Sequence, residues 1–76
     1  MTYDERTIRF TYHPPTGTQA ERYEKCRYNA LALATWIMEH SPESREQALA
    51  LTALDEVVFW TNAAIARREN PVEPTD

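Results

Sequence analysis

The sequence predicts a small all-α protein: an antiparallel two-helix hairpin preceded by a short extended N-terminal arm. Residues 44–68 contain no Gly and no Pro, and their apolar side chains recur every three or four positions, which is typical of one long amphipathic helix. Residues 18–40 show the same periodicity. The connection between the two segments is short, and a short connection between two long helices indicates an antiparallel pair.

Chain length and cysteine content limit what can hold this fold together. The 76 residues are expected to form one domain, and a chain this short buries only a modest fraction of its surface unless it is cross-linked or self-associates. Cys26 is the only cysteine, so no disulfide within the chain can cross-link it. The sequence has no charged-then-apolar leader and no apolar run approaching the roughly 18 residues of a membrane span. We therefore expect a soluble protein of the reducing cytoplasm with no membrane partner.

The charge balance excludes some functions. A formal net charge of -4 argues against DNA or RNA binding, which draws most of its affinity from a basic surface. A small anionic ligand held by a local cluster of arginines is still compatible with this charge. One Cys and two distant His, His13 and His40, argue against a metal site. Gly17 is the only Gly, so there is no phosphate-binding glycine loop, and we expect no enzymatic activity and no cofactor.

Residues 1–17 are predicted to form the N-terminal arm. Residues 1–6 are polar and are expected to be loose. The His-Pro-Pro motif at 13–15 stops any regular element, because a proline keeps the preceding residue out of helical geometry and lacks an amide donor. Between these segments, apolar residues alternate with polar ones, which is the period-two pattern of a short strand with one packed face: Ile8, Phe10 and Tyr12.

The first long helix is predicted over residues 18–40. Thr16 or Thr18 can cap its N-terminus, with Gly17 in the turn between them. One face carries an apolar stripe at alternating three- and four-residue spacing: Tyr23, Cys26, Ala30, Leu33 and Ile37.

The second helix is predicted over residues 44–68, followed by a flexible tail at 69–76. Either Ser44 caps it, with Gln47 completing a capping box, or Ser41 caps it with a proline in the first turn. The stripe expected to pack on the first helix has the same spacing: Leu51, Leu54, Val58, Thr61 and Ile65.

Several large apolar residues lie outside both stripes. A two-helix hairpin hides only one face of each helix, so this surplus implies further partners for both. Homo-oligomerisation is the simplest explanation, and the alternative is that the N-terminal arm folds back over these residues. The residues concerned are Trp36, Leu49, Val57, Phe59 and Trp60.

An anion site is expected where the hairpin opens. The unpaired N–H groups of a helix N-terminus favour anions, and the planar guanidinium of Arg suits phosphate. A rigidly held Tyr beside them can stack on a base. The alternative is that these charges are only a solvated surface. The features that meet at this end are residues 12–15, Arg22, Lys25, Arg27, Arg67 and Arg68.

The candidate residues differ in how they point. Arg27 lies on nearly the same helix face as Tyr23 and can reach over the apolar surface near Tyr12, whereas Lys25 points almost opposite. His13 precedes a proline and is expected to position the backbone or to stack, because no carboxylate or nucleophile has a spacing that marks it as a catalytic partner.

Four segments carry a resemblance to a known family: FTYHPP at residues 10–15, Gln19 with Tyr23, SPESREQALALT at residues 41–52, and FWTNAAIAR at residues 59–67. In this order they resemble the hairpin domain of phage anti-defence sponges, which is shared by the anti-CBASS cyclic-nucleotide sponge and the Thoeris anti-defence sponge. The resemblance covers nearly the whole chain, and its specificity comes from the ordered combination of the segments.

The resemblance implies a homohexamer that sequesters cyclic nucleotide messengers without cleaving them, in the cytoplasm of an infected bacterial host. Cyclic dinucleotides would lie between paired protomers, against Tyr12, His13 and a basic residue that best matches Arg27, with Lys25 as the second choice. Cyclic trinucleotides would lie where three protomers meet, against Arg67 and its neighbour Arg68.

One feature departs from the family, whose better-known sponge begins with a short helix where the alternation here predicts an extended arm. A different function also fits the same apolar surplus. The chain would then be a small non-enzymatic helical module, an adaptor or an inhibitor, that binds a host protein.

Overall fold

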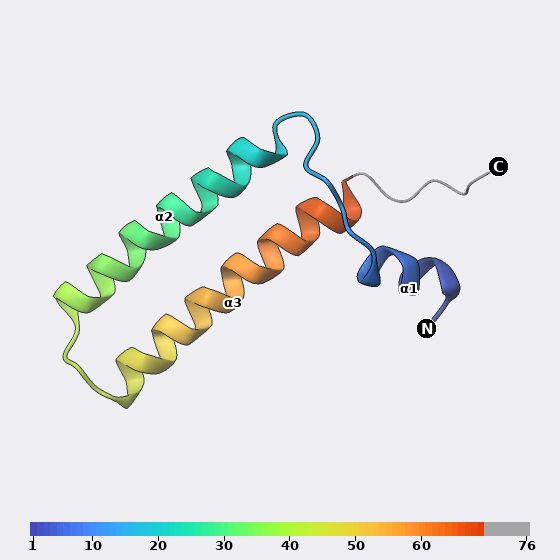
Figure 1. The fold of residues 1–76 in the computed structure, drawn as a ribbon. Coiled ribbons are helices and arrows are strands. Elements are labelled where there is room, and N and C mark those ends of the chain that lie inside the picture. Colours follow the sequence, from blue (N-terminus) through green and yellow to red (C-terminus); the bar gives the residue numbers. More distant parts are fainter. Residues whose placement is uncertain (70–76) are drawn as a thin grey trace.

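A computed structural model describes residues 1–69, which contain three helices and no strand (Figure 1). Helix α1 spans Tyr3–Phe10, α2 spans Gln19–His40 and α3 spans Arg45–Arg68. Helices α2 and α3 lie antiparallel as a hairpin, and α1 lies near the end of α3 at the open end of the hairpin (Figure 1). The predicted all-helical class is therefore confirmed. The predicted flexible tail lies, apart from Glu69, outside the described residues.

The predicted extended arm is wrong, because residues 3–10 of it form the helix α1. The hydroxyl of Thr2 caps this helix by accepting a hydrogen bond from the backbone N–H of Glu5 at 3.0 Å. Thr2 and Glu5 have the spacing of a capping box, a stronger local signal than an alternation of only three apolar residues. The helix ends at Phe10, and Thr11 is extended, with φ -121° and ψ 158°. The chain then stays non-helical through the two prolines.

The hairpin is held by a seam of half-buried side chains between α2 and α3. Two of the predicted stripe positions shift by one residue. Leu33 is 47% exposed, and Ala34 is half-buried in its place; Thr61 is exposed, and Asn62 is half-buried in its place. The other members are as the periodicity predicts: Tyr23, Cys26, Ala30 and Ile37 from α2, and Leu51, Leu54, Val58 and Ile65 from α3.

The connection between α2 and α3 decides between the two capping alternatives. Ser44 is the N-cap of α3, and its hydroxyl accepts a hydrogen bond from the backbone N–H of Gln47 at 3.1 Å. The side chain of Gln47 does not complete the capping box. It instead donates a hydrogen bond to the carbonyl oxygen of Ser41 at 3.0 Å, which links the first turn of α3 to the end of α2. At α2, Thr18 occupies the N-cap position without a side-chain capping bond.

Removing the cap of α3 should destabilise the hairpin measurably. Loss of an N-cap hydroxyl leaves a helix N–H without its partner and costs about 1 kcal/mol. Ser44→Ala should therefore lower the free energy of unfolding by about that amount in urea titrations followed by circular dichroism. Thr52→Ala, a change from an exposed hydroxyl within α3, is the control. An equal loss from both variants would contradict the capping role.

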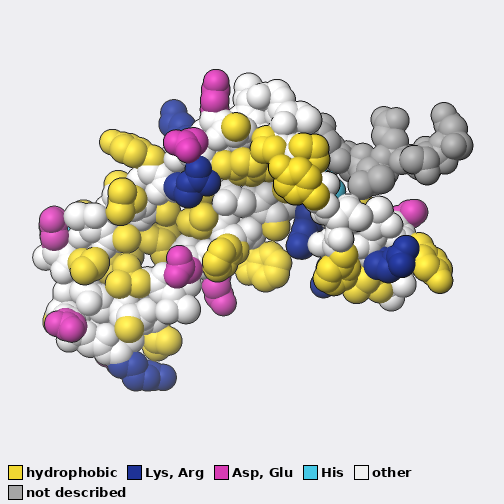
Figure 2. Space-filling view, in the orientation of Figure 1, with side chains coloured by type: hydrophobic (Ala, Val, Ile, Leu, Met, Phe, Trp, Pro, Cys, Tyr) yellow, Lys and Arg dark blue, Asp and Glu magenta, His cyan; other side chains and the backbone are white. Residues whose placement is uncertain are grey.

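Residues 1–69 form no dry hydrophobic core. Among the described residues no hydrophobic side chain is buried, and the one buried polar residue, Gln19, is 3% exposed. The chain exposes 6316 Å², whereas a compact monomer of its 8.8 kDa mass exposes roughly 4,800 Å². Figure 2 shows hydrophobic side chains spread over the outer surface of the hairpin. Phe59 and Trp60, at 67% and 68% exposed, are among the largest of them.

Helix α3 also meets the length and hydropathy criteria of a membrane span. Its 24 residues include an 18-residue window with a mean hydropathy of 1.3, although the sequence contains no uninterrupted apolar run of that length. Asp55 and Glu56 stand near the middle of the helix. A carboxylate at a bilayer centre costs roughly 2.5–3.5 kcal/mol. This placement favours the interpretation of α3 as one arm of the hairpin.

Candidate functional site

An open hollow lies where α1, the proline-containing linker, α2 and α3 meet. Its volume is about 390 Å³, within the roughly 300–1,000 Å³ typical of ligand pockets. Small residues of α3, Ala63 and Ala66, form part of its wall and leave room between the larger side chains. The polar and aromatic side chains around them are Arg9, Thr11, Tyr12, His13, Tyr23, Arg27, Asn62 and Arg67.

The hollow is strongly basic although the whole chain is acidic. Three guanidinium groups line it, from Arg9, Arg27 and Arg67, and none of the described lining residues is acidic. Arg27 pairs with Glu24 at 2.9 Å, but both side chains are more than half exposed, so the pair holds the guanidinium weakly. Among residues 1–69, the only hydrogen-bond partner of the Arg67 side chain is the backbone carbonyl of Arg9, 3.5 Å from Nη2. Arg27 and Arg67 are thus available to an anion.

Local structure explains how the two aromatic rings and the imidazole reach the hollow. Tyr23 and Arg27 are four residues apart on α2 and therefore share a face. Tyr12 and His13 leave the end of α1 in the extended linker. The Nε2 atom of His13 lies 2.6 Å from the carbonyl oxygen of Ile8, and because a carbonyl only accepts, Nε2 carries the proton in this bond. This contact ties the linker back to α1.

The structure separates the remaining sequence-predicted candidates from this hollow. Lys25 lies in a different surface depression with Glu21, Glu24 and Tyr28. The guanidinium of Arg68 is paired with Glu5, and that of Arg22 is paired with Glu69. Of the candidate site residues, those the structure brings together are Tyr12, His13, Arg27 and Arg67.

Arg9 and Asn62 line the hollow but are not among the residues that the sequence predicts there. The alternation predicts an extended arm at this position, whereas the helical path of α1 brings Arg9 to the hollow. The capping-box spacing of Thr2 and Glu5 was the signal that could have found it. Asn62 was passed over for Thr61, since apolar periodicity alone does not show which of two adjacent polar residues faces the seam.

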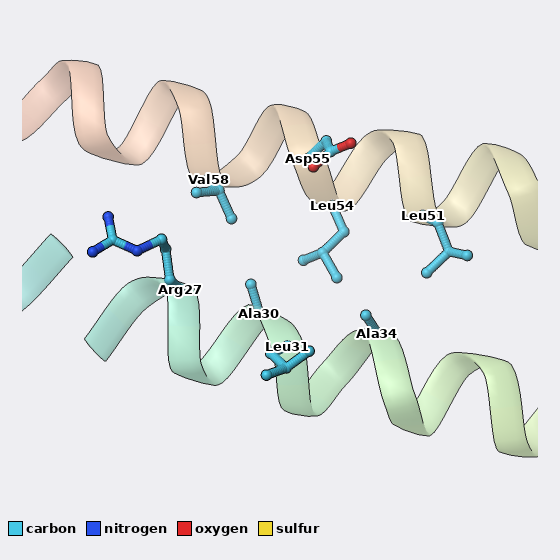
Figure 3. Close-up of a pocket in the computed structure, with 8 residues that line it drawn as sticks. All are labelled: Arg27, Ala30, Leu31, Ala34, Leu51, Leu54, Asp55 and Val58. Carbon is cyan, nitrogen blue, oxygen red and sulfur yellow. The ribbon is translucent and has the colours of Figure 1, made fainter. Parts of the chain in front are cut away.

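A second hollow of about 420 Å³ runs along the seam between α2 and α3 (Figure 3). Its walls are mostly apolar, including Ala30, Leu54 and Val58. Arg27 projects from α2 toward α3 at one end of it, and Asp55 stands on α3 (Figure 3). Arg27 therefore borders both hollows.

Two ion pairs frame the open end of the hairpin. Arg68 donates to the two carboxylate oxygens of Glu5 at 2.9 and 2.6 Å, which joins α3 to α1. This hydrogen bonding lowers the pKa of Glu5 and raises the pKa of Arg68. Arg22 likewise donates to Glu69, which lowers the pKa of that carboxyl. Buried Gln19 supports this pair by donating to the carbonyl oxygen of Ile65 and to Glu69, each at 3.3 Å.

Acid should loosen α1 from α3. The pKa of Glu5 lies below its ordinary value of 4.5 in the folded protein. The stabilisation is therefore present above pH 4.5 and is lost as the pH falls through the lower, folded-state pKa. We expect the amides of α1 to exchange faster in Glu5→Gln than in the wild type at neutral pH. After correction for the intrinsic exchange rate, the rate in Glu5→Gln at neutral pH should equal that of the wild type at acid pH. Asp4→Asn removes the same charge without breaking a described ion pair, and equal exchange in both variants would contradict this role.

Comparison with known protein families gives a match over most of the chain. A family model described as the Acb2/Tad1 hairpin domain matches residues 3–66, which include all three helices except the last two residues of α3. No curated protein and no solved structure matched the chain.

Proposed function

The chain belongs to the Acb2/Tad1 hairpin-domain family, and from this premise we propose that it is a phage anti-defence sponge. It binds cyclic dinucleotide messengers, cyclic trinucleotide messengers or both, and holds them without cleaving them. Bacterial immune effectors in the cytoplasm of the infected host are then never activated. The observation that carries the proposal is a basic and aromatic hollow on an otherwise acidic protein.

The chemistry of the hollow suits a cyclic nucleotide. A phosphodiester accepts paired N–H bonds from a guanidinium, and such charge-assisted bonds are about twice as strong as neutral ones. Arg27 and Arg67 each carry such a fork, Arg27 for a dinucleotide and Arg67 for a trinucleotide. A base has an apolar face that stacks on an aromatic ring, and Tyr12 and Tyr23 offer two rings beside the arginines. Sequestration needs only this affinity and enough copies of the protein, so no catalytic group is required.

We further propose that the working form is a homohexamer. Residues 1–69 bury no hydrophobic side chain and expose aromatic side chains on α3, so the protomer has a large apolar surface. Contacts with other copies of the same chain are the simplest way to bury this surface. In such an assembly the dinucleotide site includes Tyr12, His13 and Arg27 at paired protomers, and the trinucleotide site includes Arg67 where three protomers meet. Repetition by symmetry multiplies the charges around one ligand.

Calorimetric titration tests the binding step. The purified protein is titrated with cyclic di-adenylate, cyclic GMP–AMP and cyclic tri-adenylate, and with the linear forms of the same nucleotides. Saturable binding of at least one cyclic compound, tighter than its linear form, is expected because the ring presents its phosphates already oriented. Binding of no member of the panel would contradict the sponge. That result would favour a protein-interaction module that uses the same apolar surface to engage a host protein.

A further inference from the structure

The basic hollow is built from two parts of the chain. The hairpin supplies Tyr23 and Arg27 from α2 and the wall formed by α3. The proposed dinucleotide site combines Arg27 of the hairpin with two residues of the other part, so its shape depends on how α1 is placed against the hairpin. Helix α1 and the linker that follows it supply this other part: Arg9, Thr11, Tyr12 and His13.

Helix α1 and the start of the linker form one unit, here called the α1 unit (residues 3–13). The hydroxyl of Thr11 donates to the carbonyl oxygen of Thr7 at 2.6 Å. The Nε2 atom of His13 donates to the carbonyl oxygen of Ile8 at 2.6 Å. Both carbonyls belong to the last turn of α1, where a helix has no partners of its own for them. The position of α1 therefore sets the positions of Tyr12 and His13.

Within residues 1–69, two side chains of α3 make the hydrogen bonds between the hairpin and the α1 unit. Arg68 donates to the two carboxylate oxygens of Glu5 at 2.9 and 2.6 Å. The contact from Nη2 of Arg67 to the carbonyl oxygen of Arg9 is weaker, because its 3.5 Å exceeds the roughly 2.7–3.2 Å of an ordinary hydrogen bond. Helix α1 contains no buried residue that could anchor it by packing. The paired bonds from Arg68 to Glu5 are therefore the contact that fixes both the distance and the orientation of α1.

Glu5 also offsets a repulsion between like charges. Hydrogen bonding from Arg68, and then the charges of Arg9 and Arg67, lower the pKa of Glu5, so all three cations act on this carboxylate. Without it, Arg9 of α1 would face two arginines of α3 that have no described ion pair. Helix α1 would then separate from α3 more readily.

We propose that the Glu5–Arg68 ion pair positions the dinucleotide site by holding the α1 unit against the hairpin. Neither residue lines the hollow, so both act through the residues that they place and not by touching the ligand. This inference rests on the proposed cyclic-nucleotide function. A dinucleotide that contacts both parts of the hollow also holds them together, so ligand binding and the docking of α1 strengthen each other.

The sign of one substitution separates positioning from charge. Glu5→Gln removes a negative charge near a basic hollow, which by long-range attraction alone would strengthen the binding of an anion. The positioning role predicts the opposite: a dissociation constant about fivefold higher, near the upper limit for an exposed ion pair. Calorimetric titration with cyclic di-adenylate and cyclic GMP–AMP measures the change.

Asp4→Asn is the matched control. It removes the same charge from the same turn of α1, at an exposed position with no described ion pair. This variant should bind the two dinucleotides as tightly as the wild type or more tightly.

Exchange of the two charges tests for rescue. Glu5→Arg alone should weaken binding although it makes the protein more basic, because two arginines then repel each other. Glu5→Arg combined with Arg68→Glu rebuilds the pair in reverse at the net charge of the wild type, and most of the lost affinity should return. If Arg68 instead contacted the phosphates, the double variant would place a carboxylate there and bind more weakly than Glu5→Arg.

Hydrogen exchange reports the coupling itself, because saturation of the wild type with dinucleotide should slow the exchange of the α1 amides. Equal affinities of Glu5→Gln and Asp4→Asn, no recovery in the double variant, or α1 exchange unchanged by the ligand would overturn the positioning role while leaving the sponge intact. Failure of the wild type to bind either dinucleotide would also overturn it. Failure to bind cyclic tri-adenylate as well would overturn the proposed function.

Discussion

Arg27→Ala should weaken cyclic-dinucleotide binding by about 10- to 150-fold, the equivalent of the roughly 1.5–3 kcal/mol that a hydrogen bond to a charged group contributes. Arg27 lines the basic hollow. To bind a phosphate it must break its exposed ion pair with Glu24 on the same helix. The loss should appear in the dissociation constant measured by calorimetry, and the weakened binding should depend less on salt because one phosphate contact is gone.

Lys25→Ala is the matched control for Arg27→Ala. Both variants remove one positive charge from α2 at positions two residues apart, but Lys25 lies outside the hollow. Lys25→Ala should therefore change the affinity by no more than a few-fold. If Lys25→Ala reduced the affinity as much as Arg27→Ala does, long-range charge rather than a direct contact would explain the binding. If Lys25→Ala alone weakened binding, the site would lie on the other face of α2.

Trp60→Asp should convert the assembly into smaller species. Trp60 is 68% exposed in the protomer, on a helix with no buried residue. Burial of a large apolar side chain contributes about 1.5–3 kcal/mol, and a carboxylate at the same place must lose its hydration when an interface closes. Sedimentation should find a hexamer for the wild type and a lower mass for the variant. The variant should also melt at a lower temperature, because the assembly stabilises each hairpin.

Ala20→Asp is the control for the mass measurement, because it adds the same charge at an exposed position in the first turn of α2, where an acidic residue suits the helix dipole. It should remain assembled. A wild type that sediments as an 8.8 kDa monomer would contradict the proposed assembly directly.

The hairpin was predictable from the sequence because its signals are long and redundant. Periodicity extends through the 22 residues of α2 and the 24 of α3, and the hydroxyl of Ser44 marks the start of α3. The eight residues of α1 carry two conflicting local signals. The alternation of three apolar positions predicts an extended arm, whereas the capping-box spacing of Thr2 and Glu5 predicts a helix. Short elements depend on such local signals, and here the alternation predicts the wrong structure.

The meeting of Tyr12 and Arg67 at one site followed from topology. An antiparallel pair brings the start of α2 beside the end of α3, so residues that precede α2 come near Arg67. Side-chain partners did not follow from topology. Arg67 and Arg68 are adjacent in the sequence but point about 100° apart around the helix. Arg67 therefore lines the hollow, whereas Arg68 pairs with Glu5.

Recovery of the ligand tests the sponge most directly. The protein is incubated with each cyclic nucleotide that it binds, unbound nucleotide is removed, and the protein is denatured by heat. The released material is then identified by chromatography and mass spectrometry. The sponge predicts intact cyclic nucleotide in a fixed ratio to protein. Linear or cleaved nucleotide would reveal an enzyme, and no retained nucleotide would show that the chain does not sequester it; either result would contradict the account.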